Sequence, residues 1–200
     1  MIKVNIKSIL FVSVFFLLVF PITTTGQNYY DVKRIEVELF VGGVTPLKYN
    51  ESSKNFVGAK AGIEIRYNLS GTPFSCGING TISEFSRNWE KQTSITYTPV
   101  TSSLIFDYNF RDKGVNSAFC GIGIGFGTIH ITRYDTILQT KDYKLLSWKN
   151  FYRHSVLCIS PRAGIEIRDR FRITLDATII DSEHTYLGLC TGFVFGGKKK

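Results

Sequence analysis

Apolar and polar residues alternate along residues 57–69, which read VGAKAGIEIRYNL. The odd positions are apolar, from Val57 to Leu69, whereas the even positions carry glycine, charged residues and Asn68. Because successive side chains of a strand point to opposite faces, this pattern predicts a strand with one apolar and one polar face. It is long enough to cross the hydrocarbon core of a bilayer, which takes about 9–11 residues of tilted strand. Part of the stretch, AGIEIR, recurs at residues 163–168.

The same alternation predicts seven further strands. They are expected at residues 35–43, 74–84, 96–110, 117–130, 155–168, 171–180 and 184–195. Short turns are expected at residues 68–73, 111–115 and 169–170, and long polar loops at residues 45–55, 86–94 and 132–153. Eight antiparallel strands joined to their neighbours predict an all-β, up-and-down barrel, because closure removes exposed sheet edges. Outer-membrane barrels show this alternation of short periplasmic turns and long extracellular loops, so both termini are expected on the periplasmic side.

Glycines alternate with bulky residues in the segment GIGIGFG at residues 121–127. A nucleotide-binding fingerprint requires a strand, a glycine turn and then a helix. Here the glycines lie within a predicted strand, so this reading is rejected. We expect them to leave room for bulky side chains on the inner face.

Composition supports a sheet protein: the 200 residues include 16 Phe and 10 Tyr, and 44% are hydrophobic. The formal net charge is +8, but Lys and Arg are spread through the strands, apart from Lys198–Lys200 at the end. Nucleic-acid binding requires clustered basic residues and is not predicted. No residue spacing indicates a metal site, and no cofactor is expected.

The four cysteines, Cys76, Cys120, Cys158 and Cys190, all fall within predicted strands and form no CxxC pair. The favoured interpretation is that they pack as small apolar residues. A disulfide between Cys120 and Cys158 on neighbouring strands remains an alternative.

Residues 1–26 have the pattern of a secretory signal. Lys3 and Lys7 precede an apolar run at residues 8–22, and small residues follow up to Gly26. The run is shorter than the roughly 20 residues of a spanning helix, so cleavage before Gln27 is expected, leaving residues 27–200 as the barrel domain.

Alternation alone does not decide which face lies inside. A soluble, lipocalin-like carrier would turn the apolar face inward around a ligand, whereas an outer-membrane barrel turns it toward lipid. The second is favoured because the polar face carries charges of both signs, which pair across a narrow lumen. The expected lumen charge network is Glu36, Glu38, Lys60, Glu64, Arg66, Arg162, Glu166, Arg168, Arg172 and Asp176. The apolar face also has aromatic residues near strand ends, as an interfacial girdle would: Tyr67, Phe74, Tyr108, Phe110, Phe171 and Phe195.

The mature chain resembles the porin-family outer-membrane β-barrel domain of Gram-negative bacteria, in particular the eight-stranded OmpA/OmpX-like group in its Bacteroidota version. The residues that carry the resemblance are the signal ending before Gln27, KAGIEIRYNLSG at 60–71, SPRAGIEIRDRFRITLDA at 160–177 and the terminal GFVFGGKKK. Barrels of this group usually end on an aromatic residue read by the assembly machinery, whereas five residues follow Phe195 here. The resemblance implies an outer-membrane location and contact with membrane lipid, lipopolysaccharide and the barrel assembly machinery.

An eight-stranded barrel has an interior just wide enough for side chains to fill, so no open diffusion pore is expected. We expect a monomeric, non-enzymatic protein with a structural role or a surface-interaction role through its extracellular loops. The longest loop contains the expected contact residues Tyr134, Tyr143, Trp148 and Tyr152, which would alternatively anchor the chain at the membrane interface.

The alternative class is a lipid-modifying enzyme of the acyl hydrolase type. It would use rim histidines with a nearby serine and carboxylate, drawn from His130, His154, Ser155, Asp181, Ser182, Glu183 and His184. Nothing in the sequence fixes their mutual geometry.

Overall fold

The computed structural model describes residues 32–48, 57–69, 72–90, 93–111, 116–140, 143–168, 170–180 and 184–198. The expected signal at residues 1–26 lies outside these described residues. So do most of the expected loop at residues 45–55 and most of the expected turn at residues 111–115.

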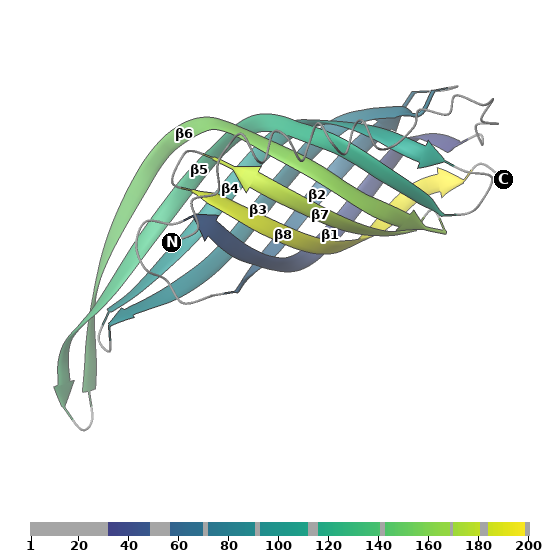
Figure 1. Ribbon diagram of the computed structural model, residues 1–200. Helices are drawn as coiled ribbons and strands as arrows, with labels where there is room; N and C mark the ends of the chain where they lie inside the picture. The colour runs from purple at the N-terminus through teal and green to yellow at the C-terminus, as the bar shows by residue number, and fades with distance from the viewer. Residues whose placement is uncertain are drawn as a thin grey trace.

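Eight antiparallel strands form one closed barrel in chain order (Figure 1). The strands are β1 (Val32–Lys48), β2 (Gly58–Asn68), β3 (Phe74–Glu90), β4 (Thr93–Arg111), β5 (Ser117–Thr140), β6 (Tyr143–Ile167), β7 (Phe171–Ile179) and β8 (Thr185–Lys198). The predicted all-β, up-and-down architecture is therefore confirmed.

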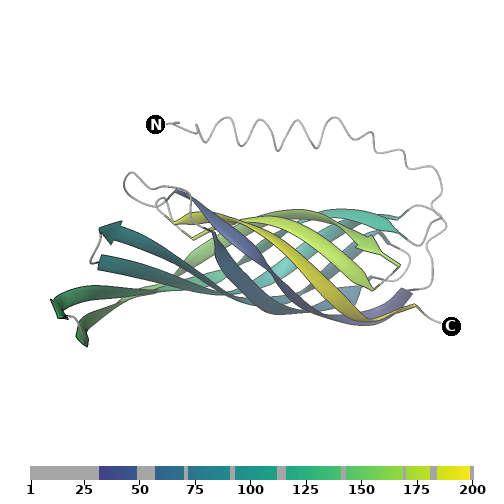
Figure 2. The same cartoon turned by 90° about the horizontal axis from the view of Figure 1, so that it is seen from below.

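Pairing of the first strand with the last closes the barrel. In this seam Val37 of β1 lies opposite Phe195 of β8, and Val44 lies opposite Gly188. We call the end where β1 begins and β8 ends the terminal end, and the opposite end the hairpin end. The short turns lie at the terminal end, whereas the β3–β4 and β5–β6 hairpins project at the hairpin end (Figures 1 and 2).

The apolar face of every strand points outward. Exposed aliphatic and aromatic side chains cover the outside of the wall, including Leu39, Ile63, Ile78, Leu104, Phe106, Phe126, Ile165, Leu175 and Leu189. The opposite face is buried and is largely polar or charged. The question that alternation left open is thereby decided: the apolar set faces away from the interior.

The glycines of GIGIGFG make room for large side chains at two of their four positions: a Cβ added to Gly121 would meet the carboxylate of Asp107, and one added to Gly127 would lie 3.3 Å from Ile180. At Gly123 and Gly125 the added atom would meet the small residue Ser103.

Other inner-face glycines also lie beside large side chains. A Cβ atom added to Gly164 would meet the ring of Phe119 at 2.7 Å. One added to Gly192 would meet the carboxylate of Glu38. Any larger residue at either position would therefore displace a side chain of the interior.

Two of the predicted loops are wrong, because their residues lie mainly in strands. Residues 86–90 extend β3 and residues 93–95 extend β4. Residues 132–140 extend β5, and residues 143–153 belong to β6. The reason is physical: apolar alternation arises where one face meets lipid or a packed interior, and a hairpin beyond the closed wall has neither.

The β5–β6 hairpin projects far beyond β7. The register of β6 with β7 begins only at Ile159 opposite Ile179, whereas β6 itself begins at Tyr143. Among the described strands, residues 143–158 of β6 therefore have β5 on one side and no neighbour on the other.

All four cysteines are free thiols, which corrects the disulfide alternative. Cys120 lies opposite Ala163 of β6, whereas Cys158 lies opposite Gly125 of β5. The two residues are thus displaced along the ladder. Their side chains also lie on opposite faces of the barrel wall, since Cys158 is fully buried on the inner face and Cys120 is half-buried on the outer face.

Candidate functional site

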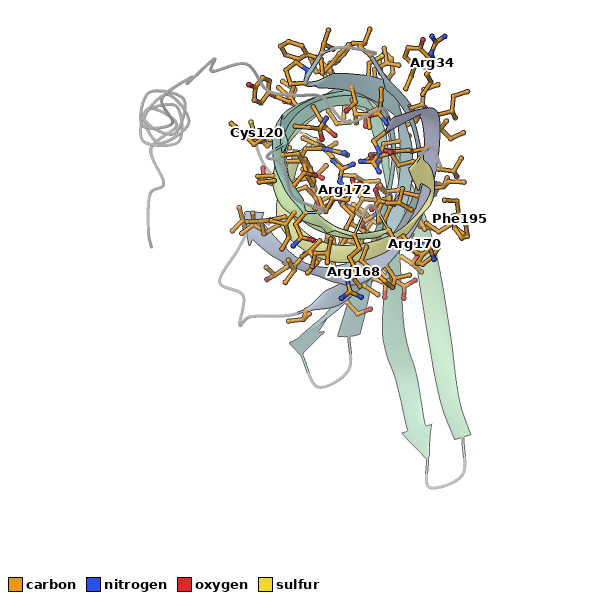
Figure 3. The ribbon with its side chains drawn as sticks, turned by 90° about the vertical axis from the view of Figure 1, so that its right-hand side faces the viewer. Arg34, Cys120, Arg168, Arg170, Arg172 and Phe195 are labelled. Carbon is orange, nitrogen blue, oxygen red and sulfur yellow. The ribbon has the colours of Figure 1, made fainter. Side chains whose placement is uncertain are left out.

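Charged side chains from five strands converge in the barrel interior. All are at most 9% exposed: Glu36, Glu38, Lys60, Glu64, Arg66, Asp107, Arg162, Glu166, Arg172 and Asp176. Figure 3 looks into this interior from the terminal end and shows Arg172 within it. Because strand side chains alternate, each strand contributes residues two or four positions apart, such as Glu36 and Glu38 of β1.

Arg162 of β6 has the tightest set of contacts. Its Nη1 and Nη2 atoms donate to the two carboxylate oxygens of Glu64 at 2.6 and 2.7 Å. Its Nε and Nη2 atoms donate to the two oxygens of Asp107 at 3.0 and 2.8 Å. One planar guanidinium thus binds two carboxylates in bidentate fashion, which is the strongest form of such pairing.

Arg172 of β7 adds a second contact to the same carboxylate. Its Nη2 donates to Asp107 at 2.9 Å, and its guanidinium lies 3.4 Å from the ring centroid of Phe119. The ring fits there because Gly164, which has no side chain, lies beside it. The cation is therefore held between a carboxylate and an aromatic face, and both stabilise it when water is excluded.

Arg66 of β2 has a looser arrangement. Four carboxylates lie 3.4–3.5 Å from its guanidinium nitrogens, those of Glu36, Glu38, Glu64 and Glu166. The two carboxylate oxygens of Glu36 accept no hydrogen bond, although the residue is 1% exposed. Arg66 is thus shared among several anions instead of being matched to one.

Lys60 and Asp176 form a separate pair, with 2.6 Å between Nζ and Oδ2. Thr178 donates to the same carboxylate oxygen at 3.0 Å. Six carboxylates therefore face four basic side chains in this described network. Removal of any one basic residue would leave an even larger excess of anions. Because a buried charge without a partner is costly, such a removal should destabilise the barrel.

An apolar cluster lies further toward the hairpin end. Its buried members are Val44, Phe85, Ile129, Cys158, Ile180 and Tyr186. On β1, Val44 follows Glu36 and Glu38 in the direction of the hairpin end, so the cluster occupies the next level of the interior. The Phe85 ring lies 5.7 Å from the Tyr97 ring and 6.0 Å from the Tyr186 ring, centroid to centroid.

A small cavity of about 30 Å³ lies beside the charge network and is lined by polar side chains that include Lys60, Thr81, Ser103 and Asp176. A buried water molecule needs roughly 10–15 Å³ counted in this way, so the cavity accommodates about two. It is far smaller than the hundreds of Å³ typical of a small-molecule site.

Arg168 requires a correction. It was expected in the lumen network, but it is exposed in the turn between β6 and β7. Its backbone has a positive φ of 55°, and its N–H donates to Asn116. The alternation of AGIEIR ends at this turn, and so the residue is not directed inward.

Asp107 is the network member that sequence reasoning missed. Its signal was present, because it alternates with Asn109 on the polar face of its predicted strand. Alternation on that strand alone does not show its partners, Arg162 and Arg172, which come from strands much later in the chain.

The four expected contact residues all lie on the β5–β6 hairpin. Tyr134 lies opposite Trp148, Tyr143 lies opposite Thr140, and Tyr152 lies opposite His130. Their side chains are outside the described residues, so the expected contact role stays a prediction.

The residues of the acyl hydrolase alternative are only partly described. His184 is 7% exposed and lies at the hairpin end, next to Ile180, whose N–H donates to its carbonyl oxygen. Residues 181–183 and the side chain of His154 are outside the described residues. The triad geometry that such an enzyme needs stays untested.

The fold defines the chain as a closed, eight-stranded, up-and-down barrel with an apolar outer wall. No helix in the described part of the chain is long and apolar enough to cross a membrane. No family model and no curated protein matches the sequence.

Solved structures of outer-membrane barrels are similar to it. Neisserial surface protein A is 9% identical, with 82% of this chain and 98% of that chain covered and a TM-score of 0.55. Ail, the attachment invasion locus protein of Yersinia pestis, is 14% identical over 80% of this chain and 98% of that chain, with a TM-score of 0.49. The N-terminal β-barrel domain of Pseudomonas aeruginosa OprF is 16% identical, with 83% of this chain and 98% of that chain covered and a TM-score of 0.40. The similarity to the Neisserial protein shows a shared fold.

Proposed function

We propose that this chain is a small integral protein of the bacterial outer membrane with a closed lumen, and that it acts through its projecting surface and not through catalysis. We place it in the OmpA/OmpX-like group of porin-family barrels, of the Bacteroidota type, on the sequence motifs quoted above. The observation that carries the proposal is the pairing of an apolar outer wall with a buried, charged interior.

The outer wall is suited to lipid and not to water. Large apolar side chains such as Phe106, at 53% exposure, and Phe126, at 65%, repeat on strand after strand. Monomeric soluble proteins rarely expose contiguous apolar patches larger than a few hundred Å². A closed barrel also satisfies its backbone hydrogen bonds internally, which a membrane-spanning sheet requires.

The interior supports a closed lumen. The charge network occupies one level and the apolar cluster the next, and the described cavity beside them holds about two waters. A hydrated ion would have to separate paired charges and then cross an apolar layer. We therefore propose that the barrel does not conduct ions or solutes freely.

The β5–β6 hairpin supports the surface-interaction role. Residues 143–158 of β6 form an edge without a neighbour among the described strands, and unpaired strand edges accept further strands by backbone hydrogen bonding. The short turns lie at the other end, so the hairpin faces the cell exterior in the usual orientation of such barrels. We propose a monomer that contacts membrane lipid, lipopolysaccharide, the assembly machinery and an extracellular partner of the hairpin, but no nucleic acid.

Heat-modifiability tests membrane insertion. Expressing cells are fractionated, and boiled and unboiled outer-membrane samples are compared on a denaturing gel. A band in that fraction whose mobility changes on boiling is expected from a closed membrane barrel. Recovery in the aqueous phase without detergent and without a mobility change would overturn the proposal.

Planar bilayers test the closed lumen. The purified barrel is expected to add no more conductance than an equal amount of detergent. Discrete, long-lived channel openings of the unmodified protein would show that the lumen is open and would contradict this part of the proposal.

A hairpin variant tests the surface role. Residues 132–150 are replaced by a two-residue Asn-Gly turn that joins Ile131 to Phe151, which lie opposite each other in the register, so that Tyr134, Tyr143 and Trp148 are removed. Adhesion of expressing cells to host cells or to extracellular matrix is expected to fall, while heat-modifiability is retained. Equal adhesion with the variant and with the unmodified protein would argue against a role of the hairpin. So would a loss of adhesion that occurs only when heat-modifiability is lost as well.

A further inference from the structure

Two aromatic clusters lie on the outer wall at the terminal end. In one, the ring centroids of Phe74 and Phe110 lie 5.4 and 4.8 Å from that of Tyr108. In the other, the centroids of Phe171 and Phe195 lie 5.4 and 4.9 Å from that of Phe193. Aromatic rings at the end of a barrel wall lie at the boundary between acyl chains and headgroups. The two clusters therefore mark the same depth in the membrane on different parts of the wall.

Only the second cluster is bordered by a basic rim in the described structure. Arg34, Arg168 and Arg170 are exposed, and we call these three residues the basic arc. Figure 3 shows Arg170 beside Phe195 and Arg168 next to Arg170, with Arg34 farther along the wall on the other side of Phe195. The basic arc thus runs from the turn before β7, past the end of β8, to the start of β1.

The backbone is anchored at two residues of the basic arc, Arg168 and Arg170, and none of its three side chains forms an ion pair with another described residue. The carbonyl oxygen of Arg170 accepts from Val194 at 2.7 Å, and its N–H donates to Ile167 at 3.2 Å. The N–H of Arg168 donates to Asn116 at 3.2 Å. Within the described residues, no carboxylate forms an ion pair with any of the three guanidinium groups. With respect to the described residues, the three guanidinium groups are therefore available to an external anion.

The sequence around the two aromatic clusters adds to the difference in charge between them. In the sequence, the segments that flank the strands of the Phe171 cluster and the start of β1, residues 31–34, 168–170 and 198–200, contain seven basic and two acidic residues. The segments that flank the strands of the Tyr108 cluster, residues 68–73 and 111–115, contain two basic and one acidic residue. A matched aromatic cluster with a nearly neutral rim therefore exists within the same molecule.

We infer that the basic arc and the Phe171–Phe193–Phe195 cluster together bind the headgroups and upper acyl chains of anionic phospholipids. The inference rests on the proposed membrane insertion, with the terminal end in the phospholipid leaflet. Guanidinium groups bind phosphate oxygens in bidentate fashion, and the rings contact the acyl chains of the bound lipids. A soluble acidic partner would leave the rings in lipid without a role, and so the combination favours a lipid.

The experiment measures lipid selectivity in the folded barrel. The full mature chain is folded into vesicles of equal parts phosphatidylcholine and phosphatidylglycerol, and the lipids retained on the released protein are counted by native mass spectrometry. The test variant combines Arg34→Gln, Arg168→Gln and Arg170→Gln. The control combines Arg111→Gln and Lys113→Gln, which removes charge beside the other aromatic cluster.

The unmodified protein is expected to retain phosphatidylglycerol over phosphatidylcholine. Because one basic residue near an anionic surface contributes about fivefold in affinity, the triple variant should lose at least about tenfold of this preference. The control should stay within about twofold of the unmodified protein. High salt should weaken the preference as well, since it screens exposed charges.

Three results would overturn the inference. One is a triple variant that keeps the preference, and another is a control that loses it equally. The third is a triple variant that retains phosphatidylglycerol as before but no longer retains added lipopolysaccharide. That lipid belongs to the opposite leaflet, so the basic arc would then face the other side of the membrane. Failure of the chain to insert at all would instead contradict the proposed function, and the mobility change on boiling separates the two cases.

Discussion

Two levels of the barrel interior differ in their chemistry. The level near the terminal end is a network of charges around Arg162 and Asp107, and the next level is an apolar cluster around Phe85 and Tyr186. The charged level depends on matched partners, because each ion is stable only while its counter-ion is present. The apolar level depends on filled volume. A single substitution should therefore damage the two levels by different routes.

The largest effect is expected from Arg162→Met. This change leaves Glu64 and Asp107 without their main partner in a water-poor interior, and breaking a buried pair costs about 3–5 kcal/mol. Urea unfolding of the barrel in phosphatidylcholine vesicles, followed by the loss of heat-modifiability, measures it. Arg168→Met is the control, since that side chain is exposed, and should stay within about 0.5 kcal/mol. Equal costs for the two variants would show that the network does not stabilise the barrel.

A somewhat smaller effect is expected from Phe85→Ala. Truncation leaves a cavity between the rings of Tyr97 and Tyr186, and such changes cost about 3 kcal/mol in a packed interior. Phe85→Leu keeps most of the volume and should cost less than about 1.5 kcal/mol in the same assay. If both variants cost the same, volume does not govern this level.

Arg172→Lys should cost about 1–2 kcal/mol. Lysine keeps the charge but loses the planar group that lies over Phe119 and donates to Asp107. A double-mutant cycle with Phe119→Leu measures the contact itself. A coupling energy of zero would mean that the ring only fills space.

The smallest effect is expected from Glu36→Gln, within about 0.5 kcal/mol or slightly stabilising. Its carboxylate accepts no hydrogen bond, and the network has more carboxylates than basic groups. Glu64→Gln is the matched comparison, because that carboxylate receives two hydrogen bonds from Arg162. A Glu36→Gln variant as unstable as Glu64→Gln would show that every carboxylate in the network is needed, whatever its contacts.

The sequence predicts the barrel well where the outer face of the wall is apolar and exposed. There the apolar and polar faces alternate, and the strands containing Ile63 and Leu175 were placed with their faces correctly assigned. It fails in the hairpins, because alternation carries no signal where neither face is packed. For the charge network, the sequence shows most of the charged residues on the inner faces of the strands, but it does not show which of them pair with each other. Asp107 meets Arg162 across the lumen, 55 positions away in the chain, and alternation on one strand says nothing of contacts across an interior.

The seam between β1 and β8 also sets the order in which the barrel is completed. β1 pairs with β8, and these are the first and the last of the described strands, so the wall closes only when these two strands meet. Contacts so distant in sequence form slowly, and until they form β1 and β8 each leave an open edge. The interior cannot lose its water, and its charges cannot pair fully, before that moment. Completion of the last strand is therefore the step that converts an open, hydrated sheet into a sealed barrel.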